Sequence, residues 1–114
     1  MITVKGIDPQ RIANNLESSM LIHPGEMIKD EIESRGITQK KLAETTGISP
    51  SVLNEMLNGK LAVSTEYALL LEAALGIDAD IWIGLQNDYD KQKAKFNQSF
   101  ANRLSLIRKI AAVL

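Results

Sequence analysis

The side chains best suited to chemistry lie in residues 38–60, which read TQKKLAETTGISPSVLNEMLNGK. This stretch is rich in hydroxyl, amide and cationic groups, and these bind phosphate oxygens and the edges of nucleic acid bases. The chain has no nucleophile–base constellation, one histidine (His23) and no cysteine. We therefore expect a binding protein and not an enzyme, with no metal site and no cofactor.

The spacing within this stretch predicts two short helices joined by a tight turn. Thr38 and Ser49 are good N-caps, and Ser49 precedes a proline, which is favoured at the first helical position. Ala43 is small where the two helices must cross. Gly47, four residues later, tolerates the positive φ that the turn needs. The apolar positions that hold the second helix against the first are Leu53 and Leu57. This is the pattern of a helix-turn-helix.

The rest of the chain also has helical spacing, with apolar residues recurring at intervals of three and four. Glycines end four of the apolar stretches, at positions 36, 47, 59 and 76, and capping residues precede the helices. We predict an all-α fold of five core helices with a helical C-terminal extension. The predicted divisions are an N-terminal arm (1–22) that could hold a short helix, a helix-turn-helix domain (23–90) and a basic amphipathic helix (91–114).

The charge of the chain is divided between these parts. Residues 1–90 contain seven Lys or Arg and all fourteen Asp or Glu, whereas residues 91–114 contain six Lys or Arg and no acid. The chain lacks cysteine, a signal peptide core and any apolar run long enough to span a membrane, so a cytoplasmic address and no membrane partner are expected. The acids at 30, 31 and 33 are interpreted as a hydrated face, with a docking patch for a basic partner as the alternative.

The apolar residues of the C-terminal third allow several interpretations. The row Trp82, Leu85 and Tyr89 could belong to the core or to a dimer interface, to which we also assign Phe96 and Phe100. The basic tail could pack on the body or on a second subunit. It could also fold only on a toxin or a nucleic acid, or lie on a membrane surface.

The sequence resembles a known family. His23-Pro24-Gly25-Glu26, the helix-turn-helix and the string Trp82-x-x-Leu85-Gln86-x-x-Tyr89-Asp90 occur in the order found in HigA-type (VapI-like) antidote proteins of toxin–antitoxin modules. The helix-turn-helix is similar to the Cro/phage-repressor (XRE) type, which implies a lambda-repressor-like fold. The resemblance covers about residues 23–91 and does not extend to the first 22 residues or the basic tail.

The resemblance implies a homodimer that binds a palindromic operator in its own promoter as a repressor. It also implies that the protein neutralises a co-expressed toxin, typically a ribonuclease that cleaves mRNA. Gln39 stands where the family contacts the DNA backbone, and Asn58, Gly59 and Lys60 stand at a loop that touches phosphate. The candidate DNA-binding residues are Thr38, Gln39, Lys40, Ser49, Pro50, Ser51, Asn54, Glu55, Asn58 and Lys60.

The predicted recognition helix differs in one respect from most DNA-binding helices, and this difference leaves a second function open. The predicted recognition helix has no Arg or Lys, although arginine to guanine is the commonest specific base contact. Together with the acidic body, this leaves as an alternative a protein-interaction module that sequesters a partner with little or no specific DNA binding. If the helix does read DNA, we expect modest base readout, more dependence on DNA shape or help from the basic tail.

Overall fold

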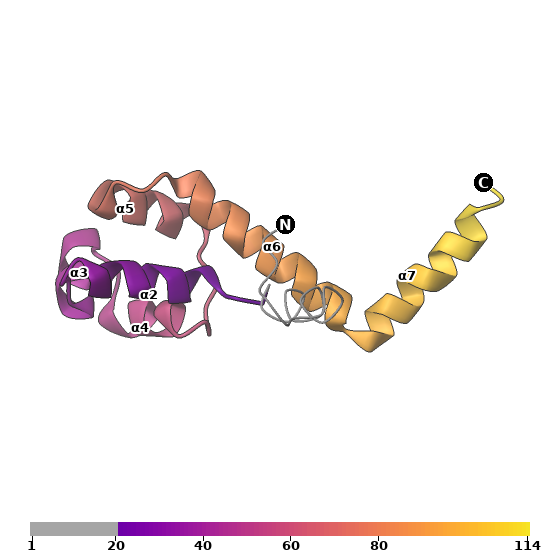
Figure 1. Cartoon of the computed structure of the whole chain (residues 1–114), viewed down its shortest axis with the longest axis horizontal. Coiled ribbons are helices and arrows are strands. Elements are labelled where there is room, and N and C mark those ends of the chain that lie inside the picture. Colours follow the sequence, from indigo (N-terminus) through magenta and orange to yellow (C-terminus); the bar gives the residue numbers. More distant parts are fainter. Residues whose placement is uncertain (1–20) are drawn as a thin grey trace, which may run out of the picture. The chain divides into compact units, whose positions relative to one another are not determined.

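The structure, a computed structural model, describes residues 21–114 of the chain. This part of the chain forms helices and no strands (Figure 1). The helices are α2 (Pro24–Ser34), α3 (Gln39–Thr46), α4 (Pro50–Leu57), α5 (Thr65–Leu75), α6 (Ala79–Phe96) and α7 (Gln98–Ala111). The all-α prediction is therefore confirmed. The predicted arm lies outside the described residues, except for Leu21 and Ile22.

The described chain falls into two units, one of which is His23–Tyr89, while the residues from Asp90 onward belong to the other. The predicted C-terminal helix differs in its start, because residue 91 lies inside α6, which continues to Phe96. No glycine, proline or capping residue interrupts the chain between 91 and 96. The break comes at Asn97, whose side chain accepts a hydrogen bond from the Phe100 N–H at 3.0 Å and caps α7.

The predicted capping residues begin their helices as expected. The Thr38 hydroxyl accepts from the Lys41 N–H at 3.1 Å, the Ser49 hydroxyl from the Val52 N–H at 3.3 Å and the Ser64 hydroxyl from the Tyr67 N–H at 3.2 Å. Each bond satisfies an N–H that has no partner within its own helix. Gly47 and Gly76 end α3 and α5 with φ values of 77° and 73°, a conformation in which other residues are strained.

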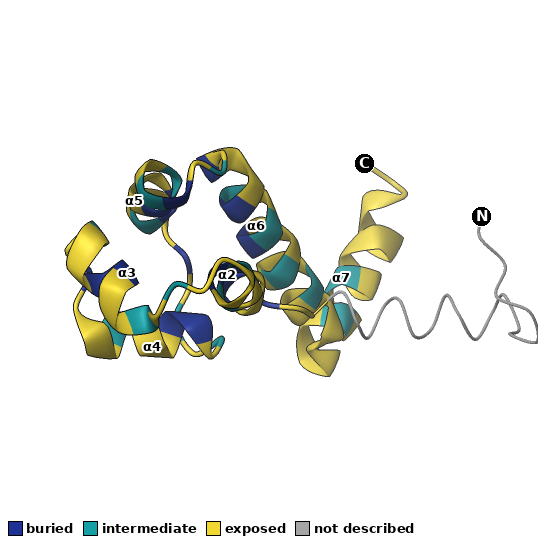
Figure 2. Cartoon of the chain, turned by 60° about the vertical axis from the view of Figure 1, so that its left-hand side comes forward, coloured by how far each residue is buried: buried dark blue, intermediate teal, exposed yellow. Residues whose placement is uncertain are grey.

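The core of the His23–Tyr89 unit is built around α4. This helix packs on α2 and α3, and α3 also packs on α5. Leu53, Met56 and Leu57 of α4 are at most 1% exposed, and α2 contributes Ile28 and Ile32. Figure 2 shows buried residues on one face of each of these helices and exposed residues on the other. No helix of residues 21–114 has the length and apolar character needed to cross a membrane.

The first turn of α2 approaches the end of α4 closely. A Cβ built on Gly25 would lie 1.8 Å from the backbone oxygen of Met56, which no side chain can tolerate. The N–H of Gly25 also donates to Nδ1 of His23 at 2.9 Å, so His23, which is 3% exposed, caps α2. Gly25 therefore allows α2 and α4 to meet.

This contact predicts a large loss of stability for Gly25→Ala. Because the added methyl group meets backbone, the two helices must separate, and we expect the free energy of unfolding to fall by about 2 kcal/mol or more. Urea unfolding followed by circular dichroism measures the change. Gly84→Ala is the matched control, since the same methyl group meets nothing within 4 Å inside α6. We expect Gly84→Ala to be neutral or to stabilise by up to about 1 kcal/mol, and equal effects of the two substitutions would contradict the account.

Candidate nucleic-acid interface

Helix α4 has one face in the core and one in solvent. Ser51, Asn54, Glu55 and Asn58 are exposed, and their spacing of three and four residues places them along the side opposite the core. Pro50 is exposed at the first position of the helix. The structure therefore groups the predicted reading residues of α4 on one solvent face.

Hydrogen bonds within α4 orient two of these side chains. The Ser49 and Ser51 hydroxyl oxygens lie 3.2 Å apart, so the capping residue is also bonded to a predicted reader. The Asn58 amide donates to Oδ1 of Asn54 at 3.2 Å. This bond leaves the Asn54 amide nitrogen to donate outward, which suits an acceptor on a base edge, such as N7 of a purine.

The first turn of α3 lies before the turn of the motif and exposes Thr38 and Lys40, while Gln39 is half-buried. The Thr38 hydroxyl is already bonded to the Lys41 N–H. The N–H groups of a first helical turn favour an anion, and the exposed Lys40 and Lys41 add positive charge. The arrangement is suited to a phosphate of a nucleic acid backbone.

The loop after α4 carries Lys60, whose side chain is exposed. The Lys60 N–H donates to the Glu55 carbonyl at 2.9 Å, which closes the helix end. Further along, the buried N–H of Val63 donates to Oε1 of Gln86 at 2.9 Å. Gln86 is only 6% exposed, so this bond anchors the loop to α6. Sequence reasoning did not give Gln86 this role, although its spacing from Trp82 and Tyr89 places it on the core side of α6.

The residues predicted to form a dimer interface lie in different surroundings. Trp82 is 3% exposed and belongs to the core. Leu85 and Tyr89 are half-buried, and the Tyr89 ring packs edge to face on His23 with 4.9 Å between centroids. Phe96 and Phe100 are exposed in the other unit. The assignment of these five residues to a dimer interface stays a prediction.

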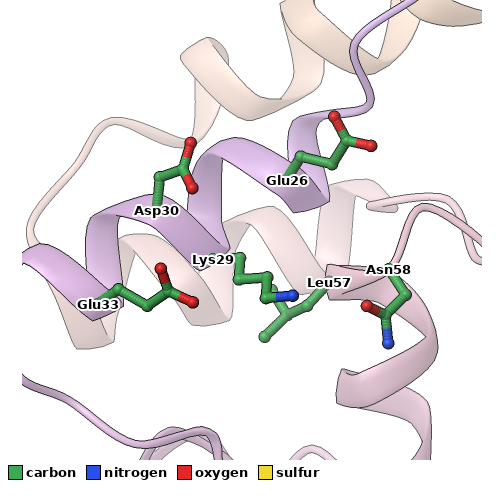
Figure 3. Close-up of a pocket in the computed structure, with 6 residues that line it drawn as sticks. All are labelled: Glu26, Lys29, Asp30, Glu33, Leu57 and Asn58. Carbon is green, nitrogen blue, oxygen red and sulfur yellow. The ribbon is translucent and has the colours of Figure 1, made fainter.

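An acidic groove of about 420 Å³ lies beside α4, between α2 and the end of α4 (Figure 3). Figure 3 shows Glu26, Asp30 and Glu33 as side chains of α2, with the Lys29 amine directed toward Asn58. The predicted acidic cluster is thus divided, because Glu31 instead pairs with Arg35 at 2.8 Å. This exposed pair adds little stability, whereas Arg35 also donates to the Leu75 carbonyl at 2.8 Å and ties α2 to α5.

Comparisons with known proteins identify this arrangement of helices. A family model for helix-turn-helix domains matches residues 28–82. Virulence-associated protein I (VapI) of Dichelobacter nodosus is 32% identical over 82 residues, which cover 71% of this chain and 76% of that protein. Antitoxin HigA-1 of Vibrio cholerae is 37% identical over 67 residues, covering 58% of this chain and 63% of the relative. The chain belongs to the HigA/VapI family of helix-turn-helix proteins.

A solved member of the HigA/VapI family has the same fold. The antitoxin HigA of Pseudomonas aeruginosa, whose structure was solved with the higBA promoter, matches with a TM-score of 0.62 and 28% identity. The match covers 65% of this chain and 82% of that chain. The family model ends at residue 82, before α7, so the basic C-terminal helix of this HigA/VapI-family protein lies outside it.

The two serines at the start of α4 have different structural roles, which predicts different effects on stability. Ser49→Ala removes the cap, and we expect the free energy of unfolding to fall by about 1 kcal/mol. Ser51→Ala removes an exposed hydroxyl that caps nothing, and the expected change is within about 0.5 kcal/mol. Urea unfolding of both variants measures the difference. A Ser51→Ala loss as large as that of Ser49→Ala would contradict these roles.

Proposed function

We propose that this HigA/VapI-family protein is a sequence-specific DNA-binding repressor that acts as a homodimer and as an antitoxin. The observation that carries the proposal is the exposed face of α4, where Ser51, Asn54 and Glu55 lie opposite a fully buried face. A helix held in this way enters a major groove without rearranging. The family match, which includes a HigA solved with promoter DNA, supports the same function.

In this proposal, the two parts of the site bind different parts of the operator. The first turn of α3, Lys40 and Lys60 bind phosphates and fix the register of the protein on the duplex. Ser51, Asn54 and Glu55 read base edges, with Glu55 accepting from a cytosine amino group. Two copies related by twofold symmetry place their α4 helices roughly 34 Å apart and read the two halves of a palindrome.

The composition of α4 limits how it reads sequence. Its solvent face has hydroxyl, amide and carboxylate groups and no cation, so it lacks the bidentate arginine–guanine contact. We propose that part of the specificity comes from the shape and deformability of the operator.

Ser51→Ala tests the assignment of a reading residue. We expect affinity for the operator to fall by about 1 kcal/mol or more, with little change for a random duplex, because only a base contact is lost. Fluorescence anisotropy with the two duplexes measures both affinities, and the unfolding experiment above controls for the fold. An equal loss for both duplexes would exclude Ser51 as a reader.

Lys60→Ala tests the assignment of a phosphate contact. We expect weaker binding to all duplexes and a salt dependence that is flatter by about one unit, since one fewer counterion is released. Lys29→Ala is the matched control, because it removes the same charge from a half-buried position in the acidic groove. A similar change of slope in both variants would show that only the net charge matters.

The net negative charge of residues 23–90 favours the alternative function, a protein-interaction module. Residues 23–90 contain twelve Asp or Glu and five Lys or Arg. In that case α4 is a structural helix, operator and random DNA bind equally weakly, and Ser51→Ala changes neither affinity.

The antitoxin part of the proposal has its own test. The protein encoded beside this chain's gene is purified, and its cleavage of RNA is measured without this chain and with an equal molar amount of it. We expect cleavage to be suppressed at equal molar amounts. Unchanged cleavage by an active neighbour, or a neighbour that does not cleave RNA, would contradict a ribonuclease-neutralising role and leave the DNA-binding part unaffected.

A further inference from the structure

Helix α7 exposes large apolar side chains along its length. None of its residues is buried, and the exposed fractions of Phe100, Ile107 and Ile110 are 43%, 50% and 59%. A single helix of 14 residues is only marginally stable by itself, so most of its stability must come from packing. Exposed apolar surface of this kind marks an interaction site.

The residues of α7 are arranged in a stripe with a basic border. The apolar positions of the stripe recur at intervals of four and three: Phe100, Leu104, Ile107 and Ala111. At 100° per residue, Arg108 borders one side of this stripe, Arg103 lies between its other side and the exposed Leu106 and Ile110, and Lys109 lies on the opposite face. With no acid in residues 91–114, the stripe fits a partner surface that is apolar and acidic.

The connection between α6 and α7 prevents α7 from folding back on the last turns of α6. Phe96 ends α6 and Gln98 begins α7, so Asn97 is the only residue between them. Antiparallel helices are joined by loops of about two to five residues, because a shorter connection cannot reverse the chain. The last turns of α6 therefore do not cover the stripe.

In the His23–Tyr89 unit, exposed apolar and acidic side chains occur together on α5 and at the start of α6. On α5 and the start of α6, Leu69, Leu70 and Ile81 are 52%, 40% and 51% exposed. The same two helices carry the exposed acids Glu66 and Asp80. Acidic charges therefore accompany the exposed apolar side chains of these two helices, here called the α5–α6 surface, and basic charges accompany those of α7.

We propose that the apolar stripe of α7 in one copy docks on the α5–α6 surface of a second copy, and that the two copies exchange α7 reciprocally. Arg103 and Arg108 then lie near Glu66 and Asp80 of the partner. Reciprocal exchange gives two identical contacts and a closed twofold dimer. Direct pairing of two α7 helices is disfavoured, because it brings the arginines of both copies together. The inference builds on the dimer part of the proposed function and gives it a surface.

Sedimentation equilibrium of the full chain without DNA tests the stripe. We expect a dimer, and Phe100→Ser/Ile107→Ser should raise its dissociation constant by at least about tenfold. Both side chains are already exposed, so the midpoint of urea unfolding of the His23–Tyr89 unit should equal that of the wild type. The control Asn102→Ala/Ser105→Ala changes the opposite face and should leave the constant unchanged. A monomeric wild type would contradict the homodimer itself, whereas a dimer with equal constants for the two double variants would overturn only the α7 surface.

Charge reversal distinguishes the α5–α6 surface from a second α7 as the occupant. Arg108→Glu and Lys109→Glu change the net charge equally on adjacent residues, but only Arg108 borders the stripe. We expect Arg108→Glu to weaken the dimer about fivefold or more and Lys109→Glu to have a smaller effect. Tighter association of Arg108→Glu would indicate pairing of α7 with α7 and would overturn the proposed surface.

Mixing two charge-reversed chains tests the exchange itself. We expect Arg103→Glu/Arg108→Glu and Glu66→Arg/Asp80→Arg each to associate weakly alone and to form a heterodimer when mixed, because both contacts then pair opposite charges. Circular dichroism checks that each variant remains helical. A mixture that stays monomeric while both variants are folded would exclude this surface. Because no DNA is present, a failure of this inference is distinct from a failure of operator binding.

Discussion

The approach of α2 to α4 at Gly25 and Met56 is the constraint on which the rest of the site depends. Helix α4 has only eight residues and cannot hold its position through length. Its inner side is completely buried, with Met56 and Leu57 at 0% exposure, and α2 closes over it because Gly25 has no side chain. With the inner side fixed, α4 presents its polar groups from a backbone that binding need not reposition.

Local hydrogen bonds then place the remaining parts of the site around α4. Thr38 and Ser49 cap the two helices of the motif, and Gln86 holds the loop that follows α4 by accepting from Val63. The two capping bonds are exposed, whereas the Val63–Gln86 bond is buried and connects the loop that carries Lys60 to the core. A change in that core is therefore expected to alter DNA affinity as well as stability.

Features determined by neighbouring residues could be predicted from the sequence, whereas those determined by distant contacts could not. The starts of α3 and α4 follow from Thr38 and Ser49, and the end of α3 follows from Gly47, because capping and positive φ are local properties. The bond between Gln86 and Val63 joins residues 23 positions apart, and the spacing that places Gln86 on the core side of α6 does not indicate its partner. Likewise, a helical pattern shows that residues 91–96 are helical but not that they continue α6.

The central claim is that the solvent face of α4 reads a DNA sequence, and one titration tests it most directly. Fluorescence anisotropy compares the DNA upstream of this chain's gene with a scrambled duplex of the same composition at two salt concentrations. The account predicts binding to the upstream DNA that is at least about 10³-fold tighter, as is typical of specific regulators. Equal and weak binding of both duplexes would contradict the claim and leave the helix-turn-helix as a scaffold for binding another protein.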